Sequence, residues 1–184
     1  MKAYITKYLA ITSLLFMISC GKKVSHDQAL TYISTIWQNY SCTVDNFNEY
    51  SQKLSEAIAT TKTNNERKLD EIVVDSLEKN YNTTIIILSS SIQKLKELDE
   101  IDTSINLKSN VLNLYQDAKY LLDSCSTQVI KSLSIGLDNV SDQDIEKIRE
   151  FTSLIIKINF EQNNIDKLAT DFQAKYHITD EEIQ

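Results

Sequence analysis

The stretch "LTYISTIWQNYSCTVDNFNEYSQKLSEAI", Leu30–Ile58, decides the fold. Apolar residues recur along it at alternating steps of three and four, the spacing that places side chains on one face of an α-helix. The pattern predicts a long helix from about Asp27 to about Thr60, packed against other helices. Its packing face carries Leu30, Ile33, Trp37, Tyr40, Val44, Phe47, Leu54 and Ile58, with Ser51 as the polar member.

A second helix is predicted after the polar stretch that follows Thr60. Thr63 and Glu66 have the spacing of a capping box, in which two side chains satisfy free N–H groups at a helix start. The helix is expected to run from there to about Leu98. Its packing face carries Val74, Leu77, Tyr81, Thr84, Leu88, Ile92 and Leu95.

The run "TTIIILSSS" (residues 83–91) lies inside this second helix and is rich in β-branched residues. Such a run could form a buried strand. We interpret it as helix, because no turn signal bounds it and the helical spacing continues through it.

A third helix is expected to open near Asp102 or Thr103. Gly136 is expected to end it, because glycine adopts the left-handed backbone that terminates helices. The packing face between these points carries Val111, Tyr115, Ala118, Leu122, Cys125 and Val129.

The last helix is predicted to start at Ser141, a residue type that caps helix N-termini. Asp142 and Asp144 in its first turn suit the positive end of the helix dipole. The helix is expected to end near His177, with an inner face of Ile145, Ile148, Ile155, Ile165, Phe172 and Tyr176.

The composition agrees with long helices joined by short loops. The chain contains no proline and two glycines, too few for a sheet protein with many tight turns. The predicted fold class is all-α, an antiparallel up-down-up-down four-helix bundle over residues 27–178. Residues 179–184 are expected to form a polar tail.

The N-terminus has the pattern of a secretory signal. Lys2 and Lys7 lie in a short first segment, and Leu9–Ile18 carries no charge. A membrane-spanning helix needs about 20 apolar residues, roughly twice this length. Residues 1–19 are therefore expected to be removed.

The four residues "MISC", Met17–Cys20, resemble the lipobox of bacterial lipoproteins, although that family usually has leucine where Met17 stands. The resemblance implies that Cys20 is lipidated and becomes the first residue of the mature chain. Residues 20–26 would then be the lipidated cysteine and a short tether. Gly21 stands where many Gram-negative lipoproteins carry an inner-membrane retention aspartate, which favours the outer membrane, on its periplasmic side or at the cell surface.

With this anchor, the helical segments and the closing "EQNNIDKLATDFQAKYHI" (residues 161–178), the chain resembles uncharacterised helical bacterial surface lipoproteins. This resemblance implies a bacterial cell-envelope location and a fold. It implies no activity and carries over no site residue other than Cys20.

Charge excludes some partners. The formal net charge is −7, and it becomes −9 if Lys2 and Lys7 leave with the signal. An acidic surface argues against a nucleic-acid partner, whose phosphates require a positive face. The acidic clusters, among them Glu97, Asp99, Glu100 and Asp102, are expected to be solvated surface.

No constellation for catalysis or metal binding is found. The di-iron bundles need Glu-x-x-His pairs, but Lys23 and Ala174 stand three residues before the only histidines, His26 and His177. Neither a nucleophile elbow nor a phosphate-binding glycine loop occurs. "DNVSDQD" (residues 138–144) has Gln143 where a calcium loop needs glycine. We therefore expect no enzyme, no cofactor and no metal.

Two cysteines remain beside Cys20. An even pair in an oxidising compartment could form a disulfide. Cys125 lies on a packing face, however, and Cys42 lies on the polar side of its helix. The two are therefore expected to stay unbonded, with Cys42 exposed.

Two function classes remain open. The first is a lipid-anchored envelope protein that binds a partner or has a structural role, held to the membrane by N-terminal acyl chains and meeting an unknown protein partner. The alternative is a periplasmic carrier of a small ligand or metal inside the bundle. It needs inward polar groups, and the packing faces offer only Ser51, Thr84, Thr152 and Gln162. The first class is favoured. Trp37, Tyr40, Phe47 and Tyr50 form an aromatic patch that could line a ligand groove. Because the first three lie on the packing face, core is favoured.

Overall fold

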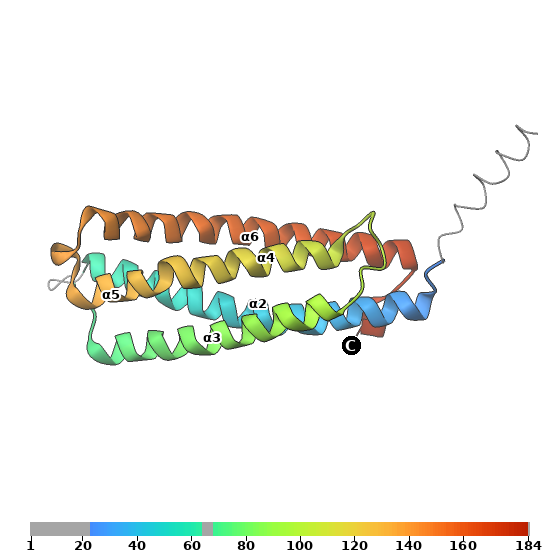
Figure 1. The fold of residues 1–184 in the computed structure, drawn as a ribbon, viewed down its shortest axis with the longest axis horizontal. Helices are drawn as coiled ribbons and strands as arrows, with labels where there is room; N and C mark the ends of the chain where they lie inside the picture. The colour runs from blue at the N-terminus through green and yellow to red at the C-terminus, as the bar shows by residue number, and fades with distance from the viewer. Residues whose placement is uncertain (1–22, 64–67, 184) are drawn as a thin grey trace, which may run out of the picture.

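A computed structural model describes residues 23–63 and 68–183. These residues are helical, contain no strand, and form four long helices packed together (Figure 1), so the all-α class is confirmed. The long helices are α2 (His26–Thr63), α3 (Glu71–Glu97), the continuous run of α4 (Leu107–Leu121), η1 (Leu122–Ser126) and α5 (Thr127–Ile135), and α6 (Asp142–Tyr176). Two short elements are η2 (Leu137–Asn139) and α7 (Asp180–Ile183).

Contacts between distant residues define two ends of the bundle. At one end the Tyr32 hydroxyl on α2 accepts a hydrogen bond from the backbone N of Lys108 on α4, at 3.2 Å. At the other, the backbone N of Leu69 donates to the carbonyl of Leu133 at 3.0 Å. We call the first the tether end and the second the distal end. The tether end lies on the right in Figure 1, where α2 begins and α6 ends.

The packing face of α2 is wider than its sequence pattern indicates. Leu30, Trp37 and Val44 lie at its edge and are half-buried. Its fully or nearly buried residues include four outside the predicted face: Tyr32, Ile36, Thr43 and Tyr50. The reason is that α2 also packs closely on α3, where the Thr43 and Ser91 hydroxyls share a 2.7 Å hydrogen bond. Trp37, expected to be a core residue, packs against the core but is only half-buried.

The predicted start of the second long helix, at a capping box of Thr63 and Glu66, is wrong. Thr63 is the last residue of α2, while Glu66 lies outside the described residues. α3 starts at Glu71, after the extended residue Asp70. Leu69 is buried and its backbone N is bonded to Leu133, so a tertiary contact holds the chain extended just before the helix.

The third long helix also starts later than expected. α4 begins at Leu107, because Asp102 is buried in a turn and Asn106 has a left-handed backbone with φ 55°. The placement of Asp102 at the solvated surface is therefore wrong. The residue is 6% exposed.

Other local predictions are confirmed. Residues 83–91 are helical within α3, and Gly136 follows α5 with φ 91°. Ser141 and Asp144 form a reciprocal capping box at the start of α6, and His177 ends that helix with φ 57°. Ile145, expected on the inner face, is instead exposed.

The C-terminal residues are more ordered than a polar tail. Ile178 is buried, and residues 180–183 form α7, which packs on α2. Glu182 accepts hydrogen bonds from the backbone N and the hydroxyl of Thr179, at 2.7 and 2.9 Å. Together with the backbone bond from Glu182 N to the Thr179 carbonyl, at 3.1 Å, they hold the final turn in place.

Candidate functional site

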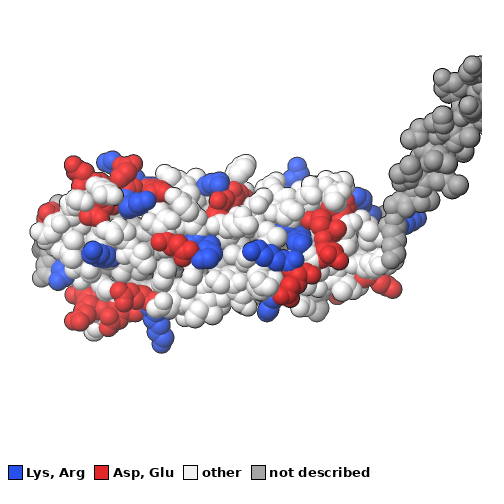
Figure 2. Space-filling model, viewed as in Figure 1, with Lys and Arg blue, Asp and Glu red and all other residues white. Residues whose placement is uncertain are grey.

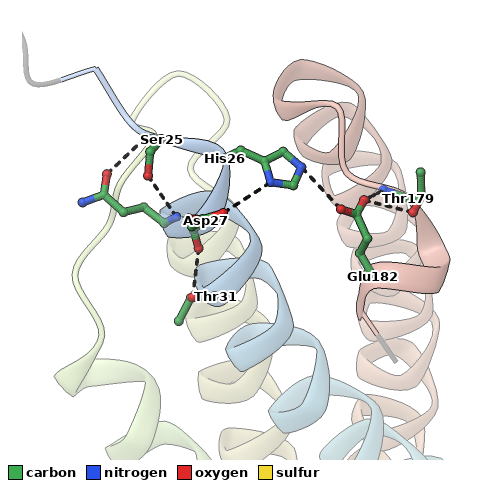
Figure 3. A network of polar contacts seen from close by, with 7 residues as sticks. Ser25, His26, Asp27, Thr31, Thr179 and Glu182 are labelled. Carbon is green, nitrogen blue, oxygen red and sulfur yellow. Dashed lines mark hydrogen bonds and ion pairs between the residues drawn. The ribbon is translucent and has the colours of Figure 1, made fainter.

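The tether end begins with a closed helix cap. The hydroxyl of Ser25 accepts from the backbone N of Gln28 at 3.2 Å, and the backbone N of Ser25 donates to the Gln28 side chain at 3.1 Å. Thr31 donates to the carbonyl of Asp27 in the next turn (Figure 3). The helical bundle therefore starts five residues after Cys20, a separation that an extended chain spans in at most about 18 Å.

The C-terminus meets this cap. His26 Nε2 lies 3.6 Å from Glu182 on α7, and its Nδ1 lies 3.9 Å from Asp27 (Figure 3). Both contacts become ion pairs when the imidazole is protonated. The pKa of Glu182 is lowered, first by the hydrogen bonds from Thr179 and further by His26. The two termini of the described chain are thus joined at the tether end.

A buried carboxylate ties the connector between α3 and α4 to the end of α6. Asp102 accepts from the backbone N and hydroxyl of Ser104 at 3.0 and 2.6 Å. It also accepts from Lys175 Nζ at 2.5 Å and from the Tyr176 hydroxyl at 3.1 Å. Burial alone would raise the pKa of Asp102, but these hydrogen bonds outweigh burial and lower it to about 2.

A second set of contacts joins the same connector to α2 and α4. The Tyr32 hydroxyl donates to Glu100, and Lys108 Nζ donates to the carbonyl of Leu98. Burial raises the pKa of Tyr32, and the hydrogen bond to Glu100 raises it further. Tyr32 therefore acts as a neutral donor that orients Glu100.

A groove of about 780 Å³ opens beside these contacts. Its half-buried apolar side chains are Val24, Leu98 and Ile101, and its exposed carboxylates are Asp27, Glu97 and Asp99; Gln28, Thr31 and Tyr32 complete the lining. The volume lies within the range of about 300–1,000 Å³ that is common for ligand sites.

The bundle interior offers much less room. A cavity of about 10 Å³ lies among Thr43, Phe47, Tyr115 and neighbouring side chains, space for about one water molecule. Among residues 23–63 and 68–183, no three His, Cys, Asp or Glu side chains converge as a metal site would require.

The inward polar residues named for a carrier are scattered. Ser51 and Thr84 are buried, whereas Thr152 is exposed. The Gln162 side chain donates to Asn48 at 3.0 Å. The sequence pattern placed Thr152 on a packing face, and that placement is wrong.

The burial of the two described cysteines agrees with the helical periodicity of the sequence. Cys42 is exposed, Cys125 is buried, and both are free thiols. Burial raises the pKa of Cys125. The predicted lipid-attachment residue, Cys20, lies outside the described residues, so its acylation stays a prediction.

Comparison of the chain with protein-family models, with curated proteins and with solved structures finds no match. Across the part of the chain that the structure describes, no helix combines the length and apolar character that crossing a bilayer requires.

The tether-end groove was missed by sequence reasoning. The sequence shows an acidic run from Glu97 to Asp102, but it does not indicate which of these carboxylates are buried and which are exposed. Asp102 is buried and bonded, Glu100 is bonded to Tyr32, and Asp99 lines the groove. The only signal was that four carboxylates stand close together where one helix ends and the next has not begun.

Proposed function

We propose that the chain is a lipid-anchored protein of the bacterial cell envelope that acts by binding or by a structural role. Acylated Cys20 would hold it, with the outer membrane favoured by Gly21. The observation that carries this proposal is the closed cap at Ser25, which begins a rigid bundle directly after a lipobox-like sequence and a short tether. The proposal assigns no catalytic residue, cofactor or metal.

The antiparallel up-down-up-down topology belongs to the same proposal. Contacts of Tyr32 with Lys108 and of Lys175 with Asp102 support it, because they gather the start of α2, the start of α4 and the end of α6. The bond from Leu69 to Leu133 supports it at the distal end. In this arrangement the tether end faces the membrane and the distal end points away.

The acyl chains would have to supply the membrane affinity. Each buried methylene contributes about 0.8 kcal/mol, so two or three chains hold a protein durably. Lys22 and Lys23 would add at most about 1 kcal/mol each over anionic lipids. Acidic side chains gather near both ends of the face in Figure 2, and carboxylates are repelled by anionic head groups.

A carrier function finds less support. The interior cavity of about 10 Å³ has no room for a ligand larger than water. The bundle surface, with a groove of about 780 Å³ at the tether end, offers more to a partner than the interior does.

Labelling with a radioactive fatty acid, followed by detergent phase separation, tests the anchor. The full chain should carry label and enter the detergent phase, while Cys20→Ala should lose the label and stay in the aqueous phase. Cys42→Ala is the matched control, because Cys42 is an exposed cysteine within α2, and this variant should behave as the wild type. A Cys20→Ala protein that still enters the detergent phase would overturn the proposal.

A further inference from the structure

We propose that the groove at the tether end binds a basic, amphipathic segment of a partner protein. The groove is the one lined by Val24, Asp27, Glu97, Leu98, Asp99 and Ile101. This inference supplies the chemistry of the partner and rests on the binding role proposed above. It does not require that Cys20 be acylated.

The apolar part of the groove is the first argument. Val24, Leu98 and Ile101 come from the start of α2, the end of α3 and the connector that follows it. All three pack on the core but keep part of their surface exposed in the groove. Covering such surface releases about 25 cal/mol per Å², so apolar side chains of a partner gain by entering.

The charges of the groove are the second argument. Asp27, Glu97 and Asp99 are exposed, and within the described residues none of them pairs with a lysine or arginine. In the described part of the chain, Glu97 accepts a hydrogen bond from the amide of Gln93, and the Asp27 carboxylate lies against the imidazole of His26. Three carboxylates around one groove create a negative potential that attracts a cationic segment.

Some acidic residues on the sides of the bundle differ in this respect. Glu49 pairs with Lys53 at 2.5 Å, Asp123 with Lys119 at 2.5 Å and Asp117 with Lys157 at 2.6 Å. The first two pairs are neutral as units, and Lys157 also lies 3.4 Å from Glu161. The groove therefore combines apolar surface with three carboxylates that, among the described residues, form no ion pair with a lysine or arginine.

The surroundings of the groove are held in place. The connector beside it is fixed on one side by Asp102 with Lys175 and on the other by Glu100 with Tyr32. A site whose walls are ordered before binding loses less conformational entropy when a partner enters. Lipid head groups fit this groove poorly, because anionic phosphates would meet three carboxylates.

Calorimetric titration tests the proposal, with the full chain purified in a nonionic detergent. The probe is a short peptide of leucine and lysine patterned as an amphipathic helix, and a peptide with glutamate in place of lysine is its control. The lysine peptide should bind and the glutamate peptide should not. Every variant is measured in the same micelles, so partition of the peptide into detergent cancels in the comparison.

Two triple variants locate the binding. Asp27→Asn, Glu97→Gln and Asp99→Asn together should weaken binding of the lysine peptide at least about tenfold. Glu71→Gln, Asp75→Asn and Glu78→Gln remove the same charge from the distal end of α3 and should leave the affinity unchanged. Equal weakening by both triples would overturn the proposal, since it would mean general attraction to an acidic protein.

A further pair of variants tests the apolar part. Ile101→Ser should weaken binding about tenfold, whereas Ile86→Ser, at a side chain 68% exposed on α3, should not. Circular dichroism must show unchanged helix content for both. Equal affinity for a peptide of lysine alone, or for the glutamate peptide, would also overturn the proposal. Because acylation plays no part in these measurements, a negative result leaves the anchor proposal to its own test.

Discussion

The two ends of the bundle are held together in different ways. At the tether end, side chains far apart in sequence bond to one another, as Asp102 does with Lys175 and Tyr32 with Glu100. At the distal end, Gly136 and the capping box of Ser141 and Asp144 turn the chain from α5 into α6. Order at the tether end depends on partners brought together by folding. Order in the turn from α5 into α6 depends on neighbours in the chain, although the backbone bond from Leu69 to Leu133 is a long-range contact at the same end.

The difference predicts different sensitivities. Loss of a local helix cap affects only the few residues that form it and lowers the free energy of unfolding by about 1 kcal/mol. The stabilisation that a buried carboxylate provides depends on pH and on each group that donates a hydrogen bond to it. The apolar core runs between the two ends. Truncation of a core side chain should therefore lower the free energy of unfolding by a similar amount near either end.

The largest effect is expected from the core that both ends share. Phe172→Ala on α6 should lower the free energy of unfolding by about 3–5 kcal/mol, because the ring is fully buried and lies between Tyr32 and Tyr176, with centroid distances of 5.3 and 4.6 Å. Phe151→Ala, toward the distal end of α6, should cost a similar amount. Urea unfolding measures both.

The control is Phe160→Ala on the same helix, whose side chain is 76% exposed and which should change the free energy of unfolding little. A Phe172→Ala protein as stable as the Phe160→Ala protein would contradict a core that extends to the tether end.

A smaller effect, with a pH signature, is expected at the tether end. The pKa of Asp102 falls from 3.8 to about 2 on folding, so the ionised carboxylate stabilises the fold at pH values above 4. Asp102→Asn should lower the free energy of unfolding at pH 7 by about 2 kcal/mol. As pH falls from 4 to 2, wild type should lose this advantage and the two curves should converge. Urea unfolding across this pH range measures it.

Asp117→Asn is the matched control, because Asp117 also pairs with a lysine, Lys157, but on the surface. It should cost less than about 1 kcal/mol at pH 7. A difference between wild type and Asp102→Asn that persists unchanged at pH 2 would show that the substitution acts through packing and not through the charge.

The smallest effect is expected at the distal end. Ser141→Ala removes the acceptor for the backbone N of Asp144 and should cost about 1 kcal/mol. Combined with Asp102→Asn, it should give an additive loss, because the two sites lie at opposite ends and share no partner. Thermal unfolding of the two single variants and the double variant measures this. A coupling well above 0.5 kcal/mol would mean that the ends do not act independently.

Several features of the fold could be predicted from the sequence because they depend on near neighbours. Periodicity alone indicated the long helices, and it placed Cys125 inside and Cys42 outside. Gly136 and Ser141 marked the distal turn, since a positive φ and a cap hydrogen bond concern only a few consecutive residues. The groove could not be predicted in the same way, because its lining joins residues 24–32 to residues 97–101.

The sequence by itself determined the helical class, much of each packing face and the caps around α6, because period and capping are local properties. Only the tertiary structure decided how far the buried face of α2 turns toward α3, that α3 and α4 start late, and that Asp102 is a buried partner of Lys175 while Asp99 stays in the groove. The physical reason is the same in each case. Burial and pairing depend on which surfaces of distant segments meet. The sequence around a carboxylate does not identify the lysine that folding brings to it.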